Sequence, residues 1–347
     1  MDRYITVETT KTLQVPTQSF SMTQWKSDFL ADLKTMYFIN DDIDSQFSPE
    51  SELVLMGKQL TTSTVATLIS LLSDLVVTKA KLGNLGEIAG VGFIRLTLNK
   101  SKNLLNAEVK AFAAAQDCDF ALITSLPDFS QPGLVLMDMD STTIQIECID
   151  EIARLYGVGD EVSAVTAAAM RGELDFNGSL RTRVSKLSGA PETVLKEVAD
   201  SMPLMPGLIE LIAGLKAVNW KVAIASGGFT YFANRLKGDH GFDAAYANTL
   251  EIVDGTLTGE VVGEIVNADV KASKLKALAE QFDIPQPQTV AIGDGANDLV
   301  MMAASALGIA IHAKPIVQEK ASVALNQLDL EGALCLLSSS LPFTAKG

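Results

Sequence analysis

The chain has 347 residues, of which 48% are hydrophobic and 20% charged, the composition of a globular protein with a sizeable core and two or three domains. Its 27 Lys and Arg against 42 Asp and Glu give a formal net charge of −15, which argues against nucleic acid or an anionic membrane as partner, because both bind basic surfaces. No apolar run reaches the ~18 residues of a membrane span, no signal peptide is evident, and Cys118, Cys148 and Cys335 fit neither a disulfide framework nor a zinc site, so we expect a cytoplasmic protein with buried thiols.

Residues 1–50 are weakly patterned. Trp25 to Tyr37 has the apolar spacing of a helix, and the polar stretch Asn40 to Ser45 would break it. We treat this segment as an N-terminal appendage whose fold the pattern does not assign.

Residues 51–126 have the element order of a ferredoxin-like α+β domain. Strands are predicted at Glu52–Met56, Leu75–Ala80, Gly92–Leu98 and Asp119–Thr124, and helices at Thr62–Ser73 and Lys102–Gln116. This βαββαβ order resembles an ACT domain, a small regulatory module often attached to enzymes of amino-acid metabolism. A plain ferredoxin-like dimerisation domain is the alternative. Because ACT-like sheets commonly pair through their edges or faces, we expect a homodimer.

The segment Leu126 to Gly133 is a natural linker, because it holds two prolines and a glycine. Strands and helices alternate after it, which predicts an α/β domain over residues 133–338 with a Rossmann-like parallel sheet. The predicted strands are Leu134–Met137, Lys221–Ala225, Thr289–Ile292 and Gly308–Ile311. Ligands of such sheets bind beyond the carboxyl ends of the strands, so these ends are the expected site.

Three of these strand ends carry polar motifs. The first strand leads into Asp138-Met139-Asp140-Ser141-Thr142, the second ends in Ser226-Gly227-Gly228, and the third runs into Gly293-Asp294-Gly295-Ala296-Asn297-Asp298. Paired carboxylates repel each other unless a cation lies between them or one stays protonated. Oxygen ligands without histidine or thiolate favour Mg²⁺, and glycines let backbone N–H groups approach a phosphate.

Together, in this order, the motifs resemble the haloacid dehalogenase superfamily of phosphatases over about residues 133–338; no GxGxxG follows a strand, which excludes a dinucleotide site. The resemblance implies that Asp138 is a nucleophile forming an aspartyl phosphate and that Asp140 is the general acid and base. It implies Mg²⁺ on the Asp138 side chain, the Asp140 carbonyl and Asp294, with the phosphate held by Ser226 and the Gly227 N–H.

The family also places a phosphate-binding lysine before the third motif. Lys271 and Lys274 are the candidates, one helical turn apart, and we favour Lys271 because it falls nearer the sheet edge. The resemblance further implies that Asn297 and Asp298 fix the metal and this lysine, with Asn297 beside the substrate.

About 85 residues separate Asp140 from Ser226, far more than one crossover helix, so we expect a helical cap over about residues 148–202. Helical patterns occur at Ile152–Tyr156, Val162–Arg171 and Pro191–Ser201. Segments here, Ile149–Ala153 and Ser179–Val184 among them, narrow the resemblance to the branch that hydrolyses O-phosphoserine, the last step of serine biosynthesis.

This resemblance implies that the cap reads the amino-acid part of the substrate. Glu147 would accept the ammonium group, Arg183 would bind the carboxylate, and Met170 and Phe176 would close the apolar side. Arg181 could exchange roles with Arg183.

The alternating residues Glu251 to Glu264, around Asp254-Gly255, predict a β-hairpin with a structural or flap role. Two other functions fit parts of these motifs: phosphotransfer to an alcohol acceptor, and an inert serine sensor. The complete set of motif residues argues against the sensor.

Overall fold

The computed structural model describes residues 3–6, 38–40, 50–61, 63–65, 67–68, 71, 79–98, 107–170 and 173–341. These residues group into two compact units. The first comprises described residues of 1–131, 309–312 and 321–347, and the second comprises 132–308 and 313–320. Within the described ranges, no helix is both long and apolar enough to cross a bilayer.

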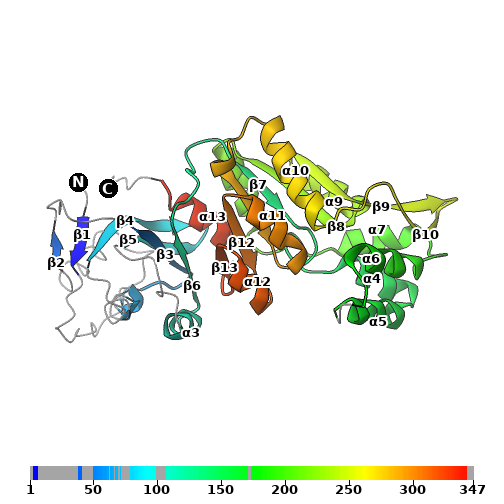
Figure 1. The fold of residues 1–347 in the computed structure, drawn as a ribbon, viewed down its shortest axis with the longest axis horizontal. Coiled ribbons are helices and arrows are strands. Elements are labelled where there is room, and N and C mark those ends of the chain that lie inside the picture. Colours follow the sequence, from blue (N-terminus) through cyan, green and yellow to red (C-terminus); the bar gives the residue numbers. More distant parts are fainter. Residues whose placement is uncertain are drawn as a thin grey trace. The chain divides into compact units, whose positions relative to one another are not determined.

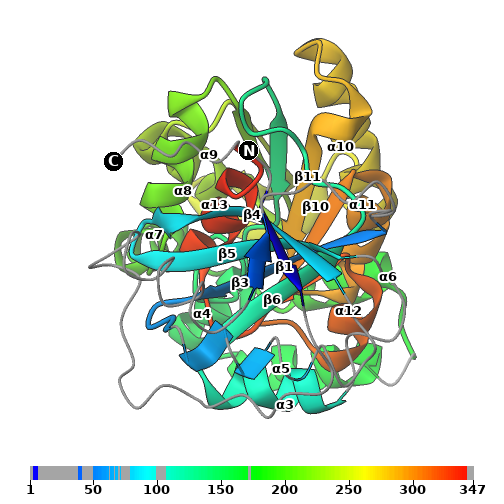
Figure 2. The same cartoon turned by 90° about the vertical axis from the view of Figure 1, so that its left-hand side faces the viewer.

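The first unit is built on a six-stranded antiparallel sheet with the strand order β2-β1-β4-β5-β3-β6, seen face-on in Figure 2. Its elements are β1 (Arg3–Thr6), β2 (Phe38–Asn40), β3 (Ser51–Gly57), β4 (Lys79–Ile88), β5 (Val91–Leu98), α3 (Ala107–Ala115) and β6 (Cys118–Ile123). Residues 63–65, 67–68 and 71 are helical. The predicted βαββαβ order is therefore present, and β3 lies between β5 and β6 as a split βαβ unit requires.

Two details of this unit differ from the sequence analysis. The described part of the second strand runs from Lys79 to Ile88, so it overlaps the end of the predicted strand Leu75–Ala80 and continues well beyond it, with a register shift between Leu82 and Leu85. Strands β1 and β2 extend the sheet beyond β4, so part of the unassigned N-terminal appendage belongs to it. The helix predicted at Trp25–Tyr37 and residues 72–78 lie outside the described residues.

The C-terminal segment packs within the first unit. Helix α13 (Leu330–Ser338) contacts β3, β4 and β5, and all nine of its residues are buried. A helix that is apolar on every side needs partners on every side, and the antiparallel sheet supplies one of them. The predicted hydrolase domain of 133–338 therefore does not coincide with one compact unit, since its last segment groups with the N-terminal sheet.

A buried carboxylate fixes the turn before α13. Asp119 on β6 is 3% exposed. Its carboxylate oxygens accept hydrogen bonds from the backbone N–H groups of Asn326 (2.9 Å), Gln327 (3.0 Å) and Leu328 (2.8 Å). Three orphan donors are thus satisfied by one side chain from a distant strand.

Substituting Asp119→Asn should destabilise the first unit by roughly 2–4 kcal/mol, because the amide group would place an N–H against at least one of these donors. Urea unfolding of the whole chain measures the effect. The exposed residue Asp160 provides the control, and Asp160→Asn should stay within about 0.5 kcal/mol of the parent. Equal stability of the two variants would contradict a role for Asp119 in fixing this turn.

The larger sheet has seven strands in the order β10-β9-β8-β7-β11-β12-β13. The strands are β7 (Leu134–Met137), β8 (Lys221–Phe229), β9 (Ala244–Val253), β10 (Thr256–Val262), β11 (Thr289–Gly293), β12 (Leu307–Ile311) and β13 (Val323–Leu325). Strand β7 pairs in parallel with β8 and β11, β8 with β9 and β12 with β13, whereas β10 pairs antiparallel with β9. The four predicted strands and the predicted hairpin are confirmed, with Asp254 and Gly255 in left-handed conformations (φ 50° and 74°) at the turn.

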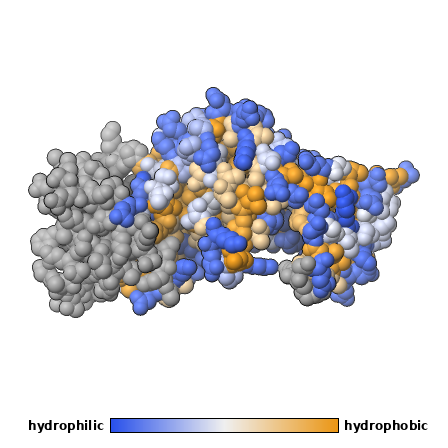
Figure 3. Space-filling view, viewed as in Figure 1, coloured by the Kyte–Doolittle hydropathy of each residue, from blue (hydrophilic) through white to orange (hydrophobic). Residues whose placement is uncertain are grey.

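Helices accompany the sheet strands of the second unit: α8 (Leu208–Ala217), α9 (Thr230–His240), α10 (Ala268–Gln281), α11 (Leu299–Ala304) and α12 (Pro315–Lys320). Helices α10 and α11 lie side by side (Figure 1). The outer side of α10 is largely hydrophilic (Figure 3), whereas its inner positions, Leu275 and Leu278 among them, are buried. Every residue of the central strands β7 and β11 is buried, as expected for parallel strands that are covered on both faces of the sheet.

The segment between β7 and β8 forms a separate group of helices beside the β9–β10 hairpin (Figure 1). It contains α4 (Cys148–Tyr156), α5 (Gly159–Met170), α6 (Phe176–Ser185) and α7 (Thr193–Ser201). The sequence pattern missed α6, because its residues are mostly polar. This helix begins at Asp175, whose side chain accepts the Gly178 N–H at 2.7 Å, and it packs against β10.

Candidate active site

The turn after β7 presents Asp138 at the carboxyl end of the sheet. The Asp138 N–H continues the ladder to the Ile292 carbonyl (2.9 Å), and its Oδ1 accepts the Met139 N–H (2.7 Å). The chain then reverses at Ser141, which has a left-handed φ of 56°. The Thr143 hydroxyl closes the turn on the Asp138 carbonyl at 2.5 Å. Asp138 is thus a buried carboxylate in one fixed orientation.

Lys271 lies beside this carboxylate. Its Nζ is 2.7 Å from Asp138 Oδ2 and 2.8 Å from Asp298 Oδ1, and the side chain is fully buried. Burial opposes the charge, but the two carboxylates outweigh it and raise the pKa of Lys271, so the ammonium form persists at all ordinary pH values. The ammonium group of Lys274 instead lies over the Tyr246 ring, 4.9 Å from its centroid. Of the two candidate lysines, Lys271 is therefore the one that contacts Asp138.

Three acids crowd around the same point. Single oxygens of Asp138, Asp294 and Asp298 lie within 4.8 Å of one another. Burial, with Asp138 as the next cause, raises the pKa of Asp294 to about 6 and that of Asp298 to about 7. One lysine does not compensate three clustered carboxylates, two of them buried, so this oxygen set fits a hard divalent cation.

The individual acids have different partners. Asp294 accepts a hydrogen bond from the Thr142 hydroxyl (2.9 Å), while Asp298 accepts from Lys271 and from the Gly295 N–H (3.0 Å). Asp298 is therefore engaged in holding the lysine, as predicted. Asp138 and Asp294 each keep lone pairs for a cation, because a carboxylate oxygen that accepts one hydrogen bond can still bind a metal. The sequence analysis assigned no role to Thr142; its position in the Asp138 turn was the only signal.

The glycines after Ser226 permit a close approach of backbone to neighbouring side chains. A Cβ on Gly227 would lie 2.8 Å from the Phe176 ring, and one on Gly228 would lie 2.7 Å from the Met139 side chain. The Gly228 N–H donates to Ser226 Oγ at 2.9 Å. The strand end therefore presents a hydroxyl and a bare backbone edge, which suits an anion.

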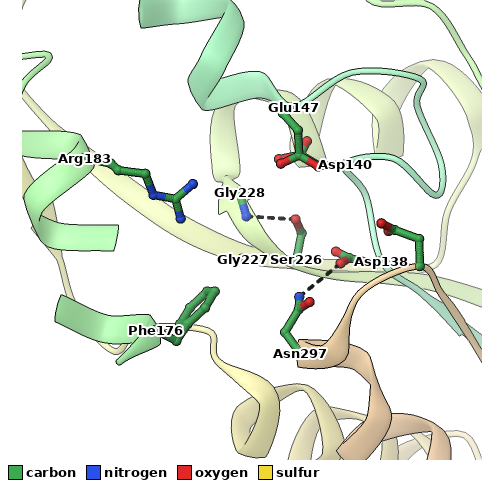
Figure 4. Close-up of a pocket in the computed structure, with 10 residues that line it drawn as sticks. Asp138, Asp140, Glu147, Phe176, Arg183, Ser226, Gly227, Gly228 and Asn297 are labelled. Atoms are coloured by element: carbon green, nitrogen blue, oxygen red, sulfur yellow. Dashed lines mark hydrogen bonds between the residues drawn. The ribbon is translucent and has the colours of Figure 1, made fainter. Parts of the chain in front are cut away.

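These groups line one cavity of about 200 Å³ in the second unit, formed by Asp138, Asp140, Glu147, Phe176, Arg183, Ser226, Gly227, Gly228, Asp294 and Asn297. In Figure 4, Arg183 and Phe176 of α6 face Asp138, Ser226 and Asn297 across the cavity. Asn297 Nδ2 lies 3.4 Å from Asp138 Oδ2. Nearly every predicted site residue is thus brought together; Gly228 was quoted in its motif but given no role.

The remaining candidates separate by position. Arg183 lines the cavity, whereas Arg181 is exposed and does not. The side chain of Met170 lies outside the described residues.

Two buried polar atoms of the cavity have no hydrogen-bond partner within the part of the chain that the structure describes. They are Asp140 Oδ1 and Arg183 Nε. Such atoms are costly unless a ligand satisfies them. Burial, followed by the charge of Glu147, raises the pKa of Asp140 well above its usual range, so this carboxyl favours its protonated form. Glu147 is exposed as a residue, but its carboxylate faces the cavity, and desolvation there raises its pKa while Ser141 donates a hydrogen bond to it (2.8 Å).

The cavity joins the Asp138 and Asp140 carboxyl groups to a glycine-flanked serine hydroxyl, and a buried lysine pairs with Asp138. This set of groups is suited to the chemistry of phosphate esters. Residues 132–306 match the family model of haloacid dehalogenase-like hydrolases, and the chain belongs to this family. Enzymes of the family use a divalent metal, which agrees with the acidic cluster.

Similar proteins within this family are named phosphoserine phosphatases. The phosphoserine phosphatase of Vibrio cholerae is 57% identical over 237 residues, covering 68% of this chain and 72% of the relative. The solved structure of a probable phosphoserine phosphatase from the same organism, in unliganded form, superposes with a TM-score of 0.72 at 47% identity over 84% of this chain and 87% of that one. A phospho-aspartyl intermediate analogue of phosphoserine phosphatase has a TM-score of 0.57 at 41% identity, covering 60% of this chain and 99% of that one.

Proposed function

We propose that this chain hydrolyses O-phospho-L-serine to L-serine and phosphate through an aspartyl phosphate on Asp138, as the last step of serine biosynthesis. One observation carries the substrate assignment. The cavity has a phosphate-binding side, made by Asp138, Ser226 and Gly227, and opposite it Arg183 and Glu147, a cation and an anion suited to an amino acid. The relatives named phosphoserine phosphatase support the same assignment.

Asp138 attacks the phosphorus. Its Oδ1 is engaged by the Met139 N–H, and Lys271 binds Oδ2, so the carboxylate is held in one orientation. Phosphate-ester hydrolysis is extremely slow without a catalyst, so the enzyme must lower the activation free energy by more than about 20 kcal/mol. A covalent intermediate helps because it divides the reaction into two steps with smaller barriers. Water then attacks the aspartyl phosphate and releases inorganic phosphate.

Asp140 transfers the protons. Its raised pKa keeps a proton on the carboxyl, which it donates to the leaving serine oxygen. The carboxylate that results then removes a proton from the attacking water, which restores the starting state. The unpartnered Oδ1 is the atom available for both transfers.

The metal is proposed to be Mg²⁺, held by the Asp138 side chain, the Asp140 carbonyl and Asp294. When bound it would neutralise charge on the phosphoryl oxygens. Thr142 orients Asp294 for this role, and Lys271 and Asp298 hold Asp138 from the other side. Asn297 lies beside both Asp138 and the substrate.

Arg183 is proposed to bind the substrate carboxylate with its planar guanidinium, and Glu147 the ammonium group, while Phe176 closes the apolar side. Arg183→Ala should lower kcat/KM for O-phosphoserine by about 10- to 150-fold, because a charged hydrogen bond contributes about 1.5–3 kcal/mol. O-phosphoethanolamine, which lacks the carboxylate, should be turned over equally well by parent and variant. Steady-state phosphate release from both substrates measures this.

The matched control is Arg181→Ala, which removes an exposed guanidinium from the same helix and should leave both rates unchanged. An equal loss on both substrates, or a loss in the Arg181 variant instead, would contradict the carboxylate assignment. Product analysis with added alcohols separates hydrolysis from phosphotransfer.

The antiparallel sheet of the first unit supports an ACT-like domain by its strand order. Its proposed roles are homodimer formation and regulation by an amino acid. The cytoplasmic location stays a prediction from the sequence.

A further inference from the structure

A buried side-chain amide outside the cavity connects two parts of the site. Asn248 on β9 is fully buried. Its Nδ2 donates to the Gly227 carbonyl at 2.8 Å, and its Oδ1 accepts the Val266 N–H at 2.8 Å. Asn248 does not line the cavity, so it acts on the site through these two backbone groups.

The first contact falls where the β8–β9 ladder is irregular. Ala225 pairs with Tyr246 and Phe229 pairs with Asn248, so Ser226, Gly227 and Gly228 stand opposite the single residue Ala247. The bulge pushes this loop out of the regular pairing. Two successive glycines leave its peptide groups free to rotate. The Asn248 amide supplies the donor that holds the Gly227 carbonyl.

Holding that carbonyl also sets the next N–H. The Gly227 C=O and the Gly228 N–H belong to one planar trans peptide and point in opposite directions. The Gly228 N–H donates to Ser226 Oγ at 2.9 Å. With one lone pair of Oγ engaged in this way, the Ser226 hydroxyl keeps its proton to donate to a ligand in the cavity that it lines. Asn248 therefore orients the serine that is proposed to bind the phosphoryl group.

The second contact reaches the lysine. Val266 precedes Asn267, the N-cap of α10, whose side chain accepts the Val270 N–H at 3.1 Å. The Asn267 carbonyl accepts the Lys271 N–H at 2.9 Å in the first turn of the helix. Fixing Val266 thus fixes the start of the helix that carries Lys271.

We infer that Asn248 is a positioning residue for phosphoryl binding, which ties the Ser226–Gly228 loop to the start of α10 and so sets the spacing of Ser226 and Lys271. The inference rests on the proposed function for its reaction but concerns only the phosphate side of the site. Asn248 should therefore affect the binding of phosphate but not that of the serine part. The serine part is proposed to bind Arg183 on α6 and Glu147 at the start of α4.

Two variants test it. Asn248→Asp keeps an oxygen for the Val266 N–H but sets a second oxygen against the Gly227 carbonyl, while Asn248→Leu removes both contacts with little change in volume. The probes are inorganic phosphate and L-serine, whose affinities are measured separately by calorimetry or competition with Mg²⁺ in excess. We expect phosphate affinity to fall by roughly 10- to 100-fold in both variants, the range for residues that orient a binding group, with L-serine affinity changed less than about threefold. The control is Thr249→Ala, an exposed neighbour on the same strand, which should change neither.

Unchanged phosphate affinity in a folded variant overturns the inference, and so does an equal loss of both affinities, which indicates a general structural role. If Asn248→Asp does not fold, Asn248→Leu decides, and a folded variant is recognised by a single cooperative thermal transition well above the temperature of the binding measurement. The proposed function fails separately: a parent chain that binds phosphate but neither binds L-serine nor hydrolyses O-phosphoserine has another substrate, and the phosphate comparison still tests Asn248.

Discussion

Asp138→Asn should reduce phosphate release from O-phosphoserine by about 10⁴-fold or more, because an amide oxygen is a poor nucleophile and no other described carboxylate occupies the same position. The substitution is close in shape. The amide oxygen of the variant side chain would still accept the Met139 N–H, so the turn after β7 should be retained. The amide nitrogen would replace Oδ2 and face the Lys271 ammonium, so the unfolding transition is measured alongside activity to separate chemistry from folding.

Rapid quenching of the enzyme with ³²P-labelled substrate gives a second measurement. The parent chain should retain label on the protein in acid, and the variant should retain none. Asp283→Asn is the control, because Asp283 is exposed in a left-handed turn (φ 56°) that asparagine also adopts readily. Phosphate release undiminished in Asp138→Asn would falsify the covalent mechanism.

Lys271→Met should lower kcat by about 10²- to 10³-fold, the effect of removing one donor from a site where negative charge is stabilised. Methionine matches the length and apolar stem of lysine but leaves Asp138 and Asp298 without their cation. Removing one partner of a buried ion pair costs about 3–5 kcal/mol of stability, so unfolding should be followed alongside activity.

The affinity for Mg²⁺ distinguishes this explanation from a collapsed site. With one positive charge removed next to the three acids, Mg²⁺ binding to a folded Lys271→Met chain should be no weaker than to the parent, although activity is lost. Lys274→Met is the matched control from the same helix. Since the Lys274 ammonium lies over the Tyr246 ring and does not line the cavity, rate and metal binding should be unchanged. Loss of activity in the Lys274 variant instead would reverse the assignment of the two lysines.

The sequence allowed most of the active-site elements to be predicted because each catalytic motif is contiguous and follows a short apolar strand. Asp138 after Leu134–Met137 and Ser226 within Lys221–Phe229 illustrate this: an unbroken apolar run identifies a buried strand, and the polar residues at its end lie at the edge of the sheet. The polar helix α6 was missed, because its position depends on packing against β10 rather than on its own apolar spacing.

The sequence alone determines the net charge of −15, because this charge is a sum over the residues. It also determines the alternation of strands and helices and the three strand-end motifs, because these are patterns of neighbouring residues. Long-range packing decided which of two lysines reaches Asp138, which of two arginines faces the cavity, and that the Asn248 amide bonds the Gly227 carbonyl. It also placed α13 on the N-terminal sheet, with Asp119 fixing the turn before it. These outcomes depend on contacts between residues far apart in the chain, and hydrophobic spacing along a segment does not specify which distant partner will bury it.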